Sequence, residues 1–268
     1  MKLKIFNIKK KISNQKLKTF YNDFGYLIIR GMFNVKETKK LDISISQFSD
    51  NEWHNIMNPD RLEFLISQSY KKFNSIQNQN ERIKFIEKAK DTSALFRSYL
   101  LDNRIKRLMK IVVGKNVNGL MTHVIFKHKK SKYAKMSWLP HQDNSYARMK
   151  NHSYITANLF IHKAFKENGC LYLYPGSHKK GLLKSKRNFS YWAKYDQRPG
   201  NKVFSNKLND SIDLNVKPGD FLIMNGNLIH GSYPNISKKY SRHLLSFNYG
   251  VMGEKFSSGK TAKRKIIN

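Results

Sequence analysis

The chain has 268 residues, and its 51 lysines and arginines against 18 aspartates and glutamates give a formal net charge of +33. A hydrophobic content of 40% supports a sizeable core and excludes a disordered chain. The single cysteine excludes a disulfide framework, and no apolar run approaches the roughly 20 residues of a membrane span, so we expect a cytoplasmic protein without a membrane span.

The first part of the chain predicts one strand among helices. Residues 17–33 predict an amphipathic segment, a turn at Gly25 and a strand over 26–29, because a β-branched run follows the turn glycine. Residues 35–113 form a helical lead-in, in which apolar residues recur at i, i+3 and i+4 from Arg61 to Val113. Gly114 ends this pattern.

Over residues 117–251 the sequence pattern changes and predicts a β core. Short apolar runs separated by glycine and proline predict strands within the stretches 119–128, 153–162, 168–178, 218–232 and 241–251. This density of strands and turns is typical of a sandwich or jelly roll. We expect one mixed α and β domain over residues 1–268. Its core is a double-stranded β-helix (jelly roll, cupin-like), flanked by helices mainly from the N-terminal half.

Two segments lie outside this scheme. Residues 183–210 are rich in Lys, Asn and Ser and poorly periodic, which predicts a surface insertion of a length typical of lids. Residues 254–268 form a basic tail that we expect to fray.

The stretch "LPHQDNSY", residues 139–146, places His141 and Asp143 two positions apart. Residues i and i+2 of a strand point to the same face, so an imidazole and a carboxylate would aim at one point. Such a pair is a weak signal alone, and a buried histidine bonded to a carboxylate is the alternative. His230, which closes the apolar stretch "DFLIMNGNLIH", strengthens it, because a jelly roll can bring two such strands face to face.

Two histidines and one carboxylate leave other coordination positions open, as in non-haem Fe(II) oxygenases. Zinc prefers more protein ligands and fits less well. Arg242 lies on the next predicted strand, and its planar guanidinium suits a co-substrate carboxylate. Ser232, two beyond His230, can donate a hydroxyl to the same group. The alternative for Arg242 is a surface arginine among many.

Five stretches, in this order, resemble the phytanoyl-CoA dioxygenase (PhyH-like) family of Fe(II)/2-oxoglutarate-dependent oxygenases: "FYNDFGYLIIRGMF", "LPHQDNSY", "NGCLYLYPGSHKKGLL", "PGDFLIMNGNLIHGSYPN" and "SRHLLSFNYG". The resemblance implies a jelly roll that uses Fe(II), 2-oxoglutarate and O2. It implies His141, Asp143 and His230 as iron ligands. It also implies Arg242 and Ser232 at the 2-oxoglutarate carboxylate, with Gln142 lining the pocket.

The resemblance also implies a hydroxylase acting on a small molecule. Halogenases similar to this family lose the carboxylate ligand, so Asp143 favours hydroxylation. Relatives act on acyl thioesters, amino acids, phosphonates and natural-product intermediates, and the excess of cations leans towards an anionic substrate. The substrate candidates are the residues around the ligands and the "PGSH" turn, for which plain packing is the alternative: Trp138, Tyr146, Arg148 and His178.

Two other classes of function compete with this interpretation. The net charge favours nucleic-acid binding, with "KYAKMSW" and "FSYWAKYDQR" as the only hints of basic residues beside aromatics. The basic residues are spread along the chain, however, which is typical of a solvated surface. The other class is a metal-dependent cupin-type enzyme without oxygenase chemistry, which would have no need of Arg242 and Ser232. The sequence does not indicate an oligomeric state.

Overall fold

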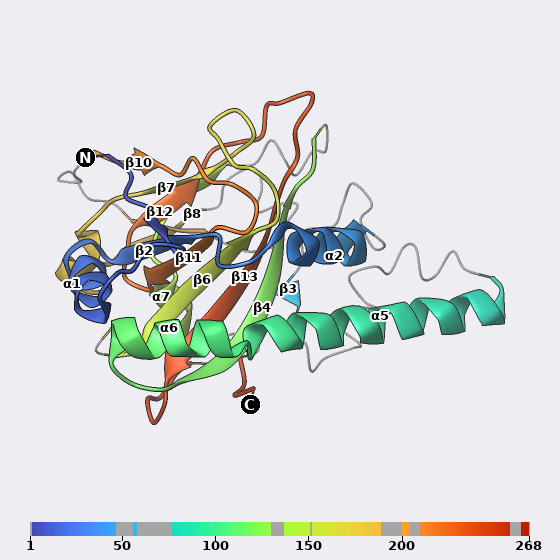
Figure 1. Ribbon diagram of the computed structural model, residues 1–268, viewed down its shortest axis with the longest axis horizontal. Coiled ribbons are helices and arrows are strands. Elements are labelled where there is room, and N and C mark those ends of the chain that lie inside the picture. Colours follow the sequence, from blue (N-terminus) through green and yellow to red (C-terminus); the bar gives the residue numbers. More distant parts are fainter. Residues whose placement is uncertain are drawn as a thin grey trace.

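The fold is taken from a computed structural model that describes residues 2–46, 56–57, 77–129, 137–150, 152–188, 200–203, 210–257 and 264–267. Helices α2 (Val35–Ser46), α5 (Gln79–Leu100) and α6 (Asn103–Val113) lie together on one side of the strands, and α1 (Asn14–Phe24) lies at one end (Figure 1). No helix in the described part of the chain is long and apolar enough to cross a membrane.

The strands form two main sheets. The larger sheet has seven strands in the order β1 (Phe6–Asn7), β2 (Tyr26–Arg30), β11 (Phe221–Asn225), β6 (Tyr154–Phe160), β13 (Arg242–Val251), β4 (Val117–Lys127) and β3 (Ile56–Met57). The smaller has four strands in the order β10 (Ile212–Asp213), β7 (Leu171–Leu173), β12 (His230–Ser232) and β5 (Trp138–His141). Neighbouring strands are antiparallel except β1 and β2. The jelly-roll expectation is confirmed.

Alternation along the strands builds one apolar layer on each face of the larger sheet. On β13, Leu245, Phe247 and Tyr249 belong to the cluster that includes the helices, whereas Leu244 belongs to a second cluster. Successive strand residues point to opposite faces, so Arg242 lies on the same face as Leu244. That second cluster also contains Leu173 of the smaller sheet, so this face is the interior between the two sheets.

Helix boundaries follow from their caps. Ser13 begins α1 by accepting a hydrogen bond from the Lys16 amide, and Asp102 begins α6 by accepting one from the Arg104 amide. Gly25 and Gly114 end α1 and α6 with φ of 75° and 79°, a left-handed conformation that glycine adopts without a Cβ penalty. The predicted turn at Gly25 and the predicted break at Gly114 are confirmed.

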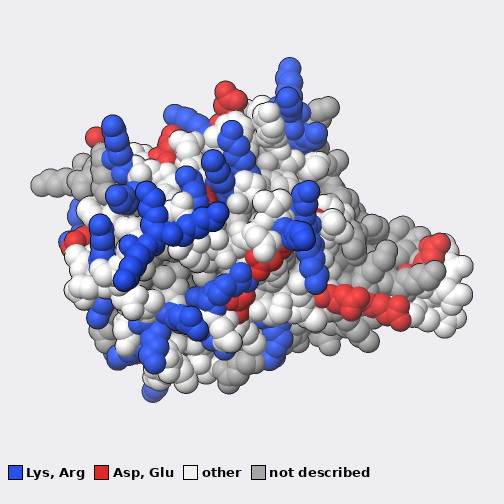
Figure 2. Space-filling model, in the orientation of Figure 1, with Lys and Arg blue, Asp and Glu red and all other residues white. Residues whose placement is uncertain are grey.

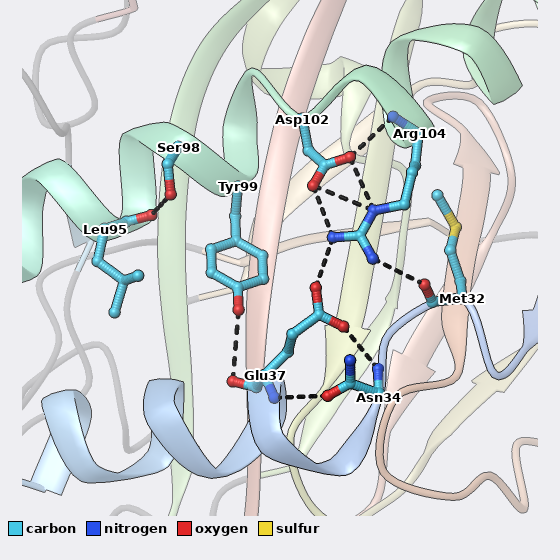
Figure 3. Close-up of polar contacts among 8 residues, drawn as sticks. All are labelled: Met32, Asn34, Glu37, Leu95, Ser98, Tyr99, Asp102 and Arg104. Atoms are coloured by element: carbon cyan, nitrogen blue, oxygen red, sulfur yellow. Dashed lines mark hydrogen bonds and ion pairs between the residues drawn. The ribbon is translucent and has the colours of Figure 1, made fainter.

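Arg104 connects the helical layer. Its Nη2 lies 2.6 Å from Glu37 Oε1 on α2 and 2.8 Å from Asp102 Oδ2, and its Nη1 donates to the Met32 carbonyl (Figure 3). Its guanidinium also lies 4.2 Å from the centre of the Phe33 ring. The group therefore holds the start of α2 against the α5–α6 junction.

The structure describes part of each of the two segments outside the predicted scheme. The 183–210 stretch contains a two-stranded sheet, β8 (Ser185–Asn188) and β9 (Gly200–Val203), while 189–199 and 204–209 lie outside the described residues. The expected fraying of the tail is wrong for residues 264–267. Arg264 is buried and donates to the Tyr146 carbonyl, and Ile267 is buried and bridges to Gly119. Part of the helical stretch, residues 61–76, also lies outside the described residues.

Candidate metal centre and co-substrate site

His141, Asp143 and His230 converge in the interior. Each offers one ligand atom, and the three atoms lie within 4.8 Å of one another. His141 Nε2 lies 3.3 Å from Asp143 Oδ1, and His230 Nε2 lies 3.5 Å from Asp143 Oδ2. The Asp143 side chain keeps 19% of its surface exposed, so the cluster is reachable from outside. Two imidazoles and one carboxylate at this spacing fit a divalent cation with open coordination positions.

The backbone orients both imidazoles. His141 Nδ1 lies 2.7 Å from the Leu139 carbonyl, and His230 Nδ1 lies 3.0 Å from the Leu228 carbonyl. A carbonyl only accepts, so each Nδ1 carries the proton and each Nε2 presents its lone pair to the cluster. This is the arrangement by which the surrounding protein fixes a metal-ligating histidine.

The cluster forms by a route that differs from the one expected. His141 is the last residue of β5, but Asp143 lies beyond that strand, with φ of −63° and ψ of −31°, at the start of α7 (Asn144–Ala147). The expected alternation along one strand is therefore wrong. His141 and His230 are neighbours across β5 and β12 of one sheet and do not face each other from two sheets.

A bulge and a clamp complete this local geometry. Between His230 and Ser232 the register of β5 slips, and Trp138 rather than Leu139 pairs with Ser232. Gln142 Nε2 donates to the Asn227 backbone carbonyl at 2.6 Å, and Asn144 Nδ2 donates to Asn227 Oδ1 at 2.9 Å. The residues on either side of Asp143 are thus fastened to the turn that precedes His230.

Asp143 is ionised in this environment. Burial would raise its pKa, but His230, His141 and the Thr156 hydroxyl outweigh burial and hold the pKa below its usual range. Thr156 Oγ1 donates to Asp143 Oδ2 at 2.7 Å and accepts from Asn248 Nδ2 at 3.2 Å. Burial lowers the pKa of His230. For His141, burial lowers the pKa and the bond to Asp143 more than compensates. A cation bound at His141 would displace the proton that its Nε2 can take up.

Arg242 belongs to a second polar group, which also contains Lys127 and Ser232. It is completely buried, and its Nε donates to the Gly169 carbonyl at 3.0 Å. Its direct partner across β13 and β4 is Lys127, which is also completely buried. Lys127 Nζ donates to Ser232 Oγ at 2.8 Å and to the Tyr233 carbonyl. Two cations and a hydroxyl therefore meet on the interior face, next to the strand that carries His230.

The electrostatics of this group favour an anion. Burial, and then the charge of Arg242, lower the pKa of Lys127 well below its ordinary value. Two adjacent cations in a low-dielectric interior raise the free energy of the protein until an anion neutralises them. The group is therefore suited to a carboxylate.

A family model for phytanoyl-CoA dioxygenase (PhyH) matches residues 21–244. The chain belongs to the phytanoyl-CoA dioxygenase family. Rice phytanoyl-CoA dioxygenase 1 is 34% identical over 129 residues, which cover 48% of this chain and 44% of that protein. Methylphosphonate hydroxylase from Gimesia maris is 30% identical over 118 residues, covering 42% and 39%. The matches thus span less than half of the length of these relatives.

Solved structures show the same fold. The epimerase SnoN, crystallised with Fe3+, alpha-ketoglutarate and nogalamycin RO, superposes with a TM-score of 0.63 at 17% identity, covering 90% of this chain and 84% of SnoN. At that identity the likeness establishes the jelly-roll fold alone.

The remaining predicted residues of the PhyH-family site take different places. Trp138 lies beside the cluster, with its ring centre 5.9 Å from that of His141 and its indole Nε1 buried without a partner in the described part of the chain. Tyr146 lies half-buried on α7, where its carbonyl accepts from Arg264. Arg148 is exposed and ends α7 with φ of 51°.

Two of the predicted site residues, Gln142 and His178, form hydrogen bonds with backbone groups. Gln142 is fully buried, and its Oε1 accepts from the Leu183 amide while its Nε2 also donates to the Gly181 carbonyl. Its side-chain amide therefore holds the chain around the cluster in place. His178 packs against Gly25, and its Nε2 meets the Asn22 carbonyl at 3.0 Å. It belongs to the contact between 3-10 helix η2 (Ser177–Lys180) and the end of α1.

Sequence reasoning missed Lys127, Thr156 and Asn248. Lys127 lies near the end of the predicted strand stretch 119–128, where the sequence shows it only as one basic residue among many. Thr156 and Asn248 are direct partners across β6 and β13. Both lie within runs that alternate as strands do, so the sequence alone marks them as ordinary strand residues.

Proposed function

We propose that this PhyH-family chain is a non-haem Fe(II)- and 2-oxoglutarate-dependent dioxygenase that hydroxylates a C–H bond of a small, anionic substrate. One observation carries the proposal. The His141–Asp143–His230 cluster and the Lys127–Arg242 pair are joined through one short strand, β12, on which His230 and Ser232 are alternate residues.

The spacing of the two groups supports 2-oxoglutarate in particular. Alternate residues of a strand lie about 6.6 Å apart, which is close to the length of a five-carbon diacid. One end of 2-oxoglutarate would bind the metal held by His230, and the distal carboxylate would meet Lys127, Ser232 and Arg242. Arg242 offers a planar pair of donors, and Lys127 offers a point charge.

When bound, Fe(II) supplies a position for O2, and 2-oxoglutarate supplies the electrons that reduce it. The chain itself positions and shields the reactants. Thr156 holds one oxygen of Asp143, the Leu139 and Leu228 carbonyls hold the imidazoles, and Trp138 covers one side of His141. The products are succinate, CO2 and the hydroxylated substrate.

An anionic substrate is supported by charge on the surface. Lys and Arg side chains are spread over the visible face, and Asp and Glu are fewer (Figure 2). Such a field raises the local concentration of anions around the protein. Two of the relatives, named for phytanoyl-CoA and methylphosphonate, suggest acyl thioesters and phosphonates as the first candidates. Amino acids and natural-product intermediates are the next substrate candidates.

The test is conversion of 2-oxoglutarate to succinate by purified protein with Fe(II) and O2, followed with a panel of acyl-CoA thioesters, alkylphosphonates and amino acids. We expect one class to accelerate succinate formation and to gain one oxygen atom by mass. Asp143→Ala should abolish both signals, whereas Asp210→Ala, at an exposed site, should leave them unchanged. Full turnover by Asp143→Ala would refute the ligand assignment.

A further inference from the structure

A second group of metal-ligand residues lies on the opposite face of the larger sheet. Asp42, His162 and His243 each offer one ligand atom, and these atoms also lie within 4.8 Å of one another. His162 Nε2 lies 3.0 Å from Asp42 Oδ1, and His243 Nδ1 lies 3.1 Å from the same oxygen. We propose that these three residues form a second metal site, separate from the catalytic one, that binds a divalent first-row cation such as Zn2+.

The fold brings the three residues together from distant parts of the chain. Asp42 lies on α2 next to the fully buried Leu41, His162 lies just beyond the end of β6, and His243 lies on β13. The amides of Ile161 and His162 both donate to the His243 carbonyl, at 3.2 and 3.3 Å. The two histidines are therefore held by backbone bonds, and their ring centres lie 4.2 Å apart.

The two candidate metal sites lie on opposite faces of the larger sheet. His243 follows Arg242 directly, and successive residues of a strand point to opposite faces. Arg242 faces the interior, so His243 faces α2 on the outer side of the sheet. The Asp42–His162–His243 cluster shares no residue with the His141–Asp143–His230 cluster.

The spacing and the donor types match a metal site. Ligand atoms around an ion with bonds of about 2.0–2.2 Å lie roughly 3 Å apart, and both imidazole nitrogens lie at such a distance from Asp42 Oδ1, 3.0 and 3.1 Å. The composition, two imidazoles and one carboxylate, equals that of the catalytic cluster, and the distances to the carboxylate are shorter. Water would complete the coordination shell from the open side, where the side chain of Asp42 keeps 37% of its surface exposed.

The surroundings hold His243 in place. Its side chain is buried, and its Nδ1 lies 3.1 Å from Asp42 Oδ1. His128 stacks on the His243 ring, with centres 5.9 Å apart, and limits its movement.

A metal ion at this site would cross-link two elements of the fold. Asp42 and His243 are 201 residues apart in sequence, and an ion bound to both joins α2 to β13 of the larger sheet. Because the unfolded chain lacks this site, binding would stabilise the native fold in proportion to the logarithm of metal concentration.

The experiment counts metal ions. Tag-free, metal-stripped protein is dialysed against buffered Zn2+, and the bound metal is measured by mass spectrometry. We expect two equivalents in the wild type, one in Asp42→Asn and one in the double variant His141→Ala/His230→Ala. The control, His152→Asn, changes an exposed histidine with φ of 57°, a conformation that asparagine tolerates, and should keep two.

One equivalent in both the wild type and Asp42→Asn would overturn the proposal. So would a folded double variant that binds no metal. Thermal unfolding gives a second readout that is independent of turnover, because Zn2+ should raise the unfolding temperature of the double variant but leave it unchanged when Asp42→Asn is added. If Asp42→Asn does not fold, the counts for the wild type and the double variant decide.

Discussion

Lys127 and Arg242 are direct partners across β4 and β13, and both side chains are completely buried. Adjacent like charges in a protein interior are costly unless a charge of opposite sign neutralises them. The pair therefore marks a place built for an anion.

Substitution of Lys127 by methionine separates binding from stability. Burial and the Arg242 charge place the folded-state pKa of Lys127 below its unfolded value of 10.5. Between the two values the native state binds fewer protons than the unfolded chain, so the stability of the wild type rises with pH across this window. Lys127→Met should flatten that rise and weaken 2-oxoglutarate binding by at least about tenfold.

Thermal unfolding from neutral to alkaline pH and calorimetric titration with 2-oxoglutarate measure the two effects. Lys36→Met, at an exposed position on α2, is the control and should change neither. An unchanged affinity in Lys127→Met would remove this lysine from the co-substrate site.

Arg242→Lys tests the planar clamp. Lysine keeps the charge but loses the fixed pair of donors, and disruption of a buried charged hydrogen bond costs about 2–5 kcal/mol. We expect the dissociation constant of 2-oxoglutarate to rise by roughly 30-fold or more, with Mn2+ as a redox-stable substitute for iron in the titration. The exposed Arg148→Lys should bind as the wild type does. Equal affinities in the two variants would contradict the clamp.

Thr156→Val tests how Asp143 is held. Valine preserves the shape but deletes the hydroxyl that donates to Asp143 Oδ2 at 2.7 Å. Loss of such an outer contact lowers metal affinity about 10–100-fold. Thr38→Val also deletes a buried hydroxyl, one that donates to the Val35 carbonyl on α2, and should leave metal affinity unchanged. A metal competition assay measures the affinity of both variants. Identical affinities in Thr156→Val and Thr38→Val would show that Thr156 does not orient Asp143.

Gly25→Ala tests the contact between α1 and His178. Gly25 has φ of 75°, and a Cβ there would lie 2.5 Å from His178 Nδ1. Gly253 has φ of 84° with no atom within 4 Å of its Cβ position, so Gly253→Ala carries the backbone strain alone. We expect about 1–2 kcal/mol of destabilisation at Gly253 and roughly 3 kcal/mol or more at Gly25. Denaturant unfolding measures both, and equal losses would show that His178 can move aside.

Much of the candidate metal and co-substrate site could be predicted because its signals are local. His141, Asp143 and His230 stand beside apolar strands and turns, and Arg242 stands at the start of another strand. Their convergence was predicted for the wrong reason, however. Direct pairing of His141 with His230 across β5 and β12 and a helical turn at Asp143 create it, and neither leaves a periodic pattern in the sequence.

Other residues could not be predicted because their roles depend on burial. Lys127 is one of 51 basic residues, and only the fold reveals that it is enclosed beside Arg242. Asp42, His162 and His243 come from α2, from the residues just beyond β6 and from β13, without a motif spacing. The family resemblance placed Gln142 at the pocket, and in the structure its side-chain amide bonds to backbone groups.

The measurement that tests the central claim most directly is an anaerobic absorption spectrum of the protein with Fe(II) and 2-oxoglutarate. Chelation of iron by 2-oxoglutarate gives a weak visible charge-transfer band. We predict this band in the wild type, its loss in His230→Ala, and a shift to higher 2-oxoglutarate concentration in Arg242→Ala. A folded, iron-loaded wild-type protein without the band would contradict the account.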